Sequence, residues 1–259
     1  MNYTIFVNGD RGIFVLKKLL KLNRYKLKGV VYCKKSIKKK LNLFSDKIKK
    51  FYLKDINSKK SEKKLRGLNS DIFLIAGYPQ IFEKKIFSLP KVMSINLHGG
   101  PLPEFRGGSP LNWQIINGRR KIGISLIKIN SKIDGGKIID TKFFNLKLNQ
   151  DIEIAHKKAN KLFYSMVKNF FERFKKSKKI SYKKKSGPSK YWSQRTDMDG
   201  KLDYKNKKSQ ECLNFIRAIS PPYPGAWLEY KTNKGSFLRL FKAKLTKKNS
   251  KKKKFIFRK

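Results

Sequence analysis

The sequence predicts an α/β protein with a doubly wound, mainly parallel, Rossmann-like sheet and a small C-terminal α+β subdomain. Two observations carry this prediction. Short apolar runs alternate with amphipathic segments across residues 1–180, and this alternation is typical of the strands and helices of a parallel sheet. A stretch dense in lysine, serine and glycine then precedes a smaller set of elements, as expected of a linker.

The predicted strands are short buried runs, of which DIFLIA at 71–76 is the clearest. We expect strands near residues 4–7, 25–33, 51–53, 71–76, 90–97 and 123–129. The predicted helices carry apolar residues at steps of three or four. We expect them near residues 13–22, 61–68, 109–117 and 151–176. Strands that alternate with helices in this way end at one common edge of the sheet, where ligands bind.

Composition divides the chain into three parts. We predict a large catalytic domain at 1–180, a lysine-rich linker at 181–190 and a small C-terminal subdomain at 191–259. In the subdomain we expect a helix at 209–219, then a proline-rich turn, then two or three strands of which the last covers 237–245. The lysine run at 247–254 predicts a frayed tail.

Cysteine content and hydropathy indicate in which cellular compartment the protein works. Cys33 and Cys212 are its two cysteines, too few for a disulfide framework or a metal cage. The longest apolar run, at 72–78, is far too short to span a bilayer. The first residues lack the basic and apolar regions of a signal peptide. We therefore expect a reduced, cytoplasmic protein without a membrane partner.

The charge of the chain is extreme. Its 65 Lys+Arg residues face 17 Asp+Glu residues, for a formal net charge of +48. Such a charge attracts polyanions without sequence preference, which would suit tRNA or another nucleic acid. However, lysine occurs in nearly every segment, and arginine, which dominates specific phosphate and base contacts, is scarce. We therefore favour solvated lysines spread over the surface.

One stretch, at 94–140, concentrates the residues that can carry chemistry. Asn96 and His98 stand two apart at the end of an apolar run, so on a strand both would project from one face. Asp134 follows after a frame of glycines and prolines. Taken singly, Asn96 and Asp134 could be turn residues and His98 a core histidine. The second histidine, His156, lies on a lysine-bearing helix, and we predict it to be a surface residue.

These residues form an ordered motif. It consists of Asn96-Leu97-His98, then Leu102-Pro103-Glu104-Phe105-Arg106-Gly107, then Asp134-Gly135-Gly136. In this order and spacing, the chain resembles the folate-dependent formyltransferases. The resemblance implies the formyltransferase fold, 10-formyltetrahydrofolate as formyl donor, no metal, and a primary amine as acceptor. It assigns the catalytic residues Asn96, His98 and Asp134. On the folate side it implies Tyr78, Gln80, Ile81, Gly99, Leu102, Arg106 and Gly135.

Formyl transfer explains why these residue types are needed. Attack of an amine on the formyl carbon puts negative charge on the formyl oxygen, which Asn96 and His98 could stabilise by donating hydrogen bonds. The amine must lose a proton, for which Asp134 is the candidate base. Asp134 could instead hold His98 in the required tautomer. For Arg106, holding the loop is as good an interpretation as binding an anion.

Further segments indicate the branch of the family. Residues 195–203 (RTDMDGKLD) and 222–227 (PYPGAW) resemble segments of the methionyl-tRNA and nucleotide-sugar formyltransferases. The tRNA enzymes carry a longer C-terminal β-barrel, so we expect a nucleotide-linked amino sugar of surface-polysaccharide synthesis as the acceptor, and a homodimer is possible. The alternatives are a methionyl-tRNA formyltransferase with a shortened C-terminal domain and a basic nucleic-acid-binding protein on a lapsed enzyme fold.

Overall fold

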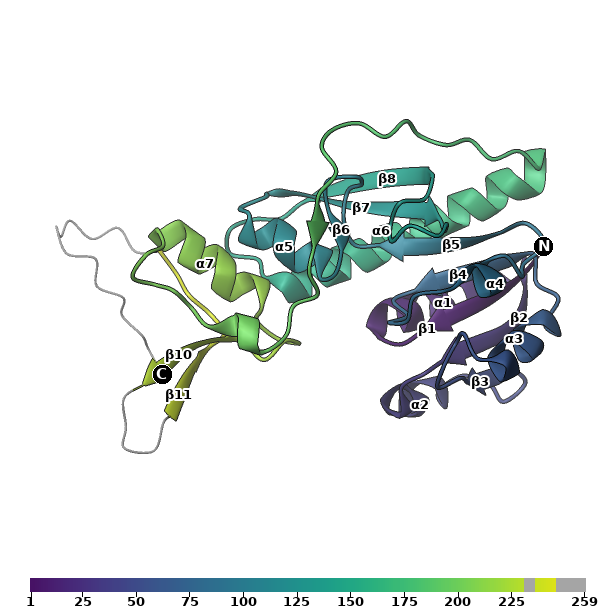
Figure 1. Cartoon of the computed structure of the whole chain (residues 1–259), viewed down its shortest axis with the longest axis horizontal. Helices are drawn as coiled ribbons and strands as arrows, with labels where there is room; N and C mark the ends of the chain where they lie inside the picture. Colours follow the sequence, from purple (N-terminus) through teal and green to yellow (C-terminus); the bar gives the residue numbers. More distant parts are fainter. Residues whose placement is uncertain (231–235, 246–259) are drawn as a thin grey trace.

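The computed structural model describes residues 1–230 and 236–245 and confirms the predicted fold class (Figure 1). A seven-stranded sheet has the order β3-β2-β1-β4-β5-β7-β8. Its parallel part consists of β1 (Asn2–Val7), β2 (Lys26–Tyr32), β3 (Lys50–Tyr52), β4 (Ile72–Ala76) and β5 (Met93–His98). Two antiparallel strands, β7 (Lys121–Lys128) and β8 (Ile138–Asn145), complete it. The sequence interpretation named no strand at β8.

Alternate residues of the central strands pack into two different cores. In β4, Leu74 and Ala76 belong to one apolar cluster, and Phe73 and Ile75 belong to the other. The first cluster is covered by α1 (Asp10–Leu20), α5 (Pro110–Ile116) and α6 (Ile152–Ser177), and the second by α3 (Lys59–Arg66) and α4 (Lys84–Phe87). Because both faces are covered, β4 is apolar throughout and fully buried, as expected of a parallel strand.

Two short helical turns follow β2, and a long helix, α6, follows β8. A one-turn 3-10 helix at Lys35–Ile37 and α2 (Lys38–Leu41) follow β2. Helix α6 begins at its N-cap Asp151, whose carboxylate accepts a hydrogen bond of 3.2 Å from the amide of Ile154. Its buried stripe runs along the first core, from Ile152 to Phe171. Helix α6 contacts α1, α5, β7 and β8.

The C-terminal part packs against the large domain through α7 (Ser209–Ala218), which lies on α5 (Figure 1). It also contains a 3-10 turn at Met198–Gly200 and a hairpin of β10 (Ala226–Tyr230) and β11 (Ser236–Leu240). The predicted last strand thus ends at Leu240, and the lysine run at 247–254 lies outside the described residues. The division at residues 180 and 190 stays a prediction.

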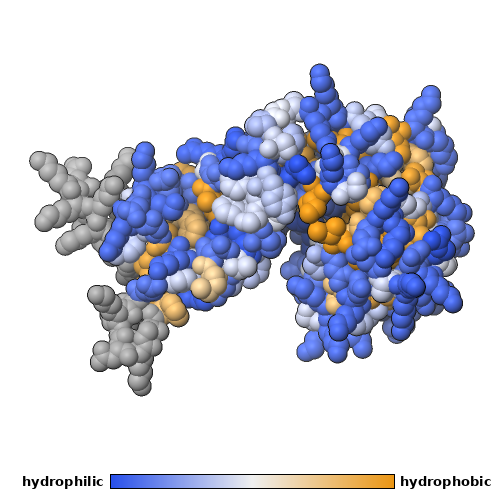
Figure 2. Space-filling model, in the orientation of Figure 1, coloured by the Kyte–Doolittle hydropathy of each residue, from blue (hydrophilic) through white to orange (hydrophobic). Residues whose placement is uncertain are grey.

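A short parallel bridge also joins the two parts of the chain. It pairs β6 (Arg106–Gly107) with β9 (Tyr191–Trp192). Hydrophilic side chains spread over both ends of the visible face (Figure 2). Among the helices that the structure describes, none combines the length and the apolar character needed to cross a membrane.

Candidate active site

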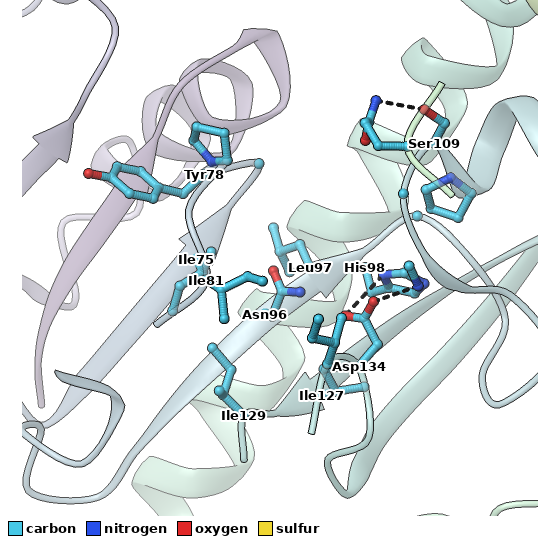
Figure 3. Close-up of a pocket in the computed structure, with 18 of the residues that line it drawn as sticks. Ile75, Tyr78, Ile81, Asn96, Leu97, His98, Ser109, Ile127, Ile129 and Asp134 are labelled. Carbon is cyan, nitrogen blue, oxygen red and sulfur yellow. Dashed lines mark hydrogen bonds and ion pairs between the residues drawn. The ribbon is translucent and has the colours of Figure 1, made fainter. Parts of the chain in front are cut away.

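Strand β5 brings Asn96 and His98 to the edge of the sheet on the same face, as the spacing predicts (Figure 3). In the ladder, Asn96 stands beside Ile75 of β4 and Ile127 of β7. His98 is nearly buried, with 5% of its surface exposed. The amide of Asn96 has no hydrogen-bonding partner within residues 1–230 and 236–245 and points into a cleft (Figure 3).

The loop after His98 is held by polar side chains from the neighbouring elements. Gln114 of α5 donates to the carbonyl of Gly99 at 2.9 Å and accepts from the amide of Gly123 at 2.7 Å. The hydroxyl of Ser125 donates to the carbonyl of Gly100 at 2.8 Å. A Cβ on Gly100 would lie 2.6 Å from the Cβ of Phe105, closer than real carbon atoms approach. Glycine is therefore needed for the loop to fold back beneath the imidazole.

Asp134 comes from the loop between β7 and β8 and adopts a left-handed backbone, with φ of 48°. Arg106 fixes this loop, because its Nε and Nη2 donate to the carbonyl of Ile133 at 3.1 and 2.7 Å. The amide of Gly107 donates to Oδ2 of Asp134 at 2.9 Å. The other carboxylate oxygen lies 3.4 Å from Nδ1 of His98. Of the two interpretations of Arg106, the structure supports the one in which it holds the loop.

The hydrogen bonds of His98 define where its proton resides. Its Nε2 lies 2.5 Å from the carbonyl oxygen of Phe105, and a carbonyl can only accept, so Nε2 carries a hydrogen. Nδ1 faces the carboxylate of Asp134, and the pair can share one proton between them. Burial lowers the pKa of His98, while the charge of Asp134 and the Phe105 carbonyl oppose this change. Both ring nitrogens are thus engaged, which leaves Asn96 as the free donor.

The cleft beside these residues has a volume of about 530 Å³. One wall is apolar and carries Ile75, Ile81 and Ile129, which lie near Asn96, and Tyr78, whose ring points away from Asn96 (Figure 3). The hydroxyl of Tyr78 donates to the carbonyl of Leu53 at 3.3 Å, and burial raises its pKa, so the phenol stays neutral. This wall offers a flat, apolar surface to a planar ring, as ligand pockets commonly do.

The predicted folate-side residues divide into two groups. Tyr78, Gln80, Ile81 and Gly99 line the cleft, although the Gln80 amide is already bonded to the backbone of 54–56, accepting at 2.8 Å and donating at 2.6 Å. Three others do not line it. Leu102 is buried behind it, Arg106 holds the Asp134 loop, and Gly135 lies within that loop.

One part of the cleft, the polar end, carries polar residues that sequence reasoning missed. Arg11, Asn112, His156 and Tyr223 line it, and they come from α1, α5, α6 and the turn before β10. The prediction that His156 is a surface residue was wrong. Its Nε2 lies 3.1 Å from the hydroxyl of Tyr223, and burial, assisted by the charge of Arg11, lowers its pKa to about 4. Its position four residues after Ile152 was the available signal, because i and i+4 share a helix face.

The part of the chain that the structure describes holds no group of three or more His, Cys, Asp or Glu side chains suited to a metal ion. The polar groups that line the cleft are amides, hydroxyls, one carboxylate, imidazoles, a guanidinium and the ammonium of Lys132. Such a set can donate hydrogen bonds to a developing charge and accept a proton.

Two protein-family models match this chain. A family model described as "Formyl transferase" matches residues 26–166, and one described as "Formyl transferase, C-terminal domain" matches residues 195–256. The chain belongs to the formyl transferase family. The resemblance inferred from Asn96, His98 and Asp134 is thereby confirmed.

Curated relatives share part of their length with this chain. The bifunctional polymyxin resistance protein ArnA of Wigglesworthia glossinidia brevipalpis is 33% identical over 192 residues, 74% of this chain and 29% of the relative. The methionyl-tRNA formyltransferase of Caldanaerobacter subterraneus subsp. tengcongensis is 29% identical over 181 residues, 70% of this chain and 57% of the relative. The chain thus spans less than two thirds of these relatives.

Solved structures share the fold. A sugar N-formyltransferase from Shewanella sp FDAARGOS_354 has a TM-score of 0.76 at 18% identity, covering 95% of this chain and 99% of that one. HypX from Aquifex aeolicus in complex with tetrahydrofolic acid has a TM-score of 0.65 at 14% identity, covering 88% of this chain and 36% of that one. At these identities the likeness establishes the architecture alone.

Proposed function

We propose that this protein transfers a formyl group from 10-formyltetrahydrofolate to a primary amine. The observation that carries the proposal is the arrangement at the end of β5. The unpartnered amide of Asn96 stands in the cleft, next to a buried His98 that shares a contact of 3.4 Å with Asp134. A hydrogen-bond donor beside a proton acceptor is the minimum that attack on a carbonyl requires.

The roles of the residues follow from these contacts. When bound, 10-formyltetrahydrofolate supplies an electrophilic formyl carbon. Asn96 donates its amide hydrogen to the formyl oxygen as negative charge develops there. The His98–Asp134 pair takes the proton that the amine loses as its nitrogen bonds to the formyl carbon. The pair then returns this proton to the folate nitrogen as the bond between that nitrogen and the formyl carbon breaks. Phe105 and Gly107 keep the pair in place through the imidazole Nε2 and the carboxylate Oδ2.

The apolar wall fits the donor. Ile75, Tyr78, Ile81 and Ile129 would hold the pterin ring, with the backbone of the surrounding loops within reach of its polar edges. Ile81 is 66% exposed, although large apolar side chains usually avoid water. A planar ring stacked there would cover it. The tetrahydrofolate in the HypX neighbour supports a folate in a protein of this fold.

For the acceptor we propose a nucleotide-linked amino sugar. The Shewanella sugar N-formyltransferase supports this choice through its TM-score of 0.76, against 0.65 for a methionyl-tRNA formyltransferase from Clostridium thermocellum, since both matches extend over nearly the whole of the two chains compared. In the present structure the C-terminal part contributes Tyr223 to the cleft. A small acceptor would therefore meet residues from both parts of the chain.

A methionyl-tRNA acceptor is the second candidate. It is favoured by the curated relatives that carry this name and by the net charge of +48. A surface of this charge would bind the tRNA backbone with a steep dependence on salt. However, hydrophilic side chains are spread over both ends of the visible face (Figure 2).

An acceptor screen tests the proposal. Tetrahydrofolate release from 10-formyltetrahydrofolate would be followed with a panel of UDP- and dTDP-linked 3-amino and 4-amino sugars and with charged initiator tRNA. The proposal predicts turnover on at least one sugar, abolished in Asp134→Asn, which keeps the shape of the side chain. Turnover on tRNA alone would favour the second candidate. Silence with every amine, although the donor binds, would contradict formyl transfer.

A further inference from the structure

Arg11 is the most unusual polar residue of the cleft outside the Asn96, His98 and Asp134 group. It lies in the first turn of α1, half-buried, with its guanidinium over the ring of Phe163 at 4.7 Å. One nitrogen, Nη1, donates to the carbonyl of Leu97 at 2.9 Å. Leu97 stands between Asn96 and His98, so Arg11 is tied to the backbone of the reacting residues.

The charge of Arg11 is not neutralised by the protein. Within residues 1–230 and 236–245, no carboxylate lies within ion-pairing distance of its guanidinium, and its Nε is buried without a hydrogen-bonding partner. The adjacent Asp10 pairs with Lys40, and Asp134 is engaged by His98 and Gly107. A partly buried cation without a counterion is costly, and a ligand anion would offset this cost.

The groups around Arg11 are neutral and can donate hydrogen bonds. Tyr223 keeps a neutral phenol because burial raises its pKa. Burial lowers the pKa of His156 to about 4, so its imidazole is neutral at physiological pH. Asn112 is fixed by its bond to the carbonyl of Ala218 at 2.8 Å, which ties this end of the cleft to the C-terminal part. Helix α1, with no side chain capping its first turn, adds a favourable dipole.

We propose that Arg11, together with Tyr223 and His156, binds a phosphate oxyanion of the amine acceptor at the polar end of the cleft. The inference rests on the proposed function and deepens it by naming a chemical group that the acceptor must carry. Arg11 suits this role because its Nη2, which makes no hydrogen bond among the described residues, can donate to a phosphate oxygen while Nη1 stays on the carbonyl of Leu97. It also links recognition to catalysis, because the same side chain bonds Leu97.

Binding measurements on the whole chain test the proposal, with inorganic pyrophosphate as the probe. Calorimetric titrations would compare the unchanged protein with Arg11→Gln and Lys17→Gln. Lys17 is an exposed residue of the same helix, so its variant removes the same charge outside the cleft. We expect pyrophosphate binding to weaken at least about tenfold in Arg11→Gln and to stay within about twofold in Lys17→Gln. Tetrahydrofolate binding should be equal in all three.

Three results would overturn the inference. Equal weakening in both variants, or no pyrophosphate binding by the unchanged protein, would leave only the diffuse attraction of a basic surface. Loss of tetrahydrofolate binding in Arg11→Gln would mean that Arg11 holds the folate carboxylate instead. Neither readout requires formyl transfer, so a failed acceptor screen would not decide this test.

A second measurement needs no variant and covers the case in which Arg11→Gln fails to fold. Phenylglyoxal modifies arginine side chains, and mass spectrometry locates the modified residues. Pyrophosphate should slow the modification of Arg11 at least about fivefold while leaving Arg66, which is exposed and distant in the sequence, unchanged. Equal rates at Arg11 with and without pyrophosphate would overturn the proposal.

Discussion

The His98–Asp134 pair and Arg11 differ in how many of their hydrogen-bonding and charged groups have a partner in the protein. At the end of β5, His98 and Asp134 are bonded to each other and to the backbone of Phe105 and Gly107. At the polar end, Arg11 retains an unbonded Nε and no counterion among the described residues. The difference teaches that the pair proposed to move protons is prearranged by the fold, whereas the charge of Arg11 is left without a partner, as we propose for a group that binds an anionic ligand.

The largest expected effect comes from breaking the prearranged pair. His98→Ala or Asp134→Ala should lower turnover at least about a hundredfold, because the proton of the amine loses its acceptor. The measurement is steady-state release of tetrahydrofolate. His156→Ala is the matched control, as it removes the other histidine at the polar end. We expect a change there of no more than about tenfold, mainly in KM for the acceptor. Near-normal turnover in His98→Ala would refute the assigned pair.

A smaller effect should follow when the support beneath the pair is disturbed. In Gly100→Ala, the new methyl group would meet Phe105 at 2.6 Å and push its carbonyl away from His98. We expect a loss of about 2 kcal/mol in the free energy of unfolding and a loss of turnover in the protein that remains folded. Gly67→Ala is the control, since its Cβ would meet nothing closer than 3.5 Å. Equal stability of the two variants would contradict the packing argument.

The polar end of the cleft can be examined through the pH dependence of stability. The folded-state pKa of His156 is about 4, below its ordinary value of 6.5. Between pH 6.5 and 4 the unfolded chain therefore binds a proton that the folded chain does not. Stability contributed by neutral His156 is present above pH 6.5 and is lost as the pH falls.

Urea unfolding at pH 7 and pH 5 measures this contribution. His156→Gln should reduce the difference in unfolding free energy between the two pH values by about 1–2 kcal/mol. Buried His98 titrates in the same direction, so part of the pH dependence should remain in the variant. An unchanged difference would show that His156 is exposed enough to be protonated in the folded protein.

The features at the end of β5 could be predicted from the sequence better than those at the polar end of the cleft. The parallel strands and the shared face of Asn96 and His98 follow from local periodicity, which the sequence contains. The antiparallel return of β8 was not predicted, because Gly135 and Gly136 were interpreted only as part of the motif. Gly136 must in fact be glycine because a Cβ would lie 1.6 Å from the carbonyl of Lys128.

The polar end could not be predicted for a different reason. Arg11, Asn112, His156 and Tyr223 come from four segments and meet only when α1, α5, α6 and the C-terminal turn pack together. For His156 the local signal was weak, because only its spacing of four residues from the buried Ile152 distinguishes it from a surface histidine on a lysine-bearing helix. The role of Arg106 likewise became clear only from its two bonds to the carbonyl of Ile133.

The central claim is that Asn96 stabilises charge that develops during formyl transfer, and one comparison tests it most directly. Asn96→Ala and the unchanged protein would be compared in kcat and in the Kd for 10-formyltetrahydrofolate. If the Asn96 amide is needed only as charge develops, Asn96→Ala should leave the Kd for 10-formyltetrahydrofolate within about threefold and lower kcat by at least about a hundredfold. A weakened Kd with an unchanged kcat would contradict the account, because Asn96 would then only bind the donor.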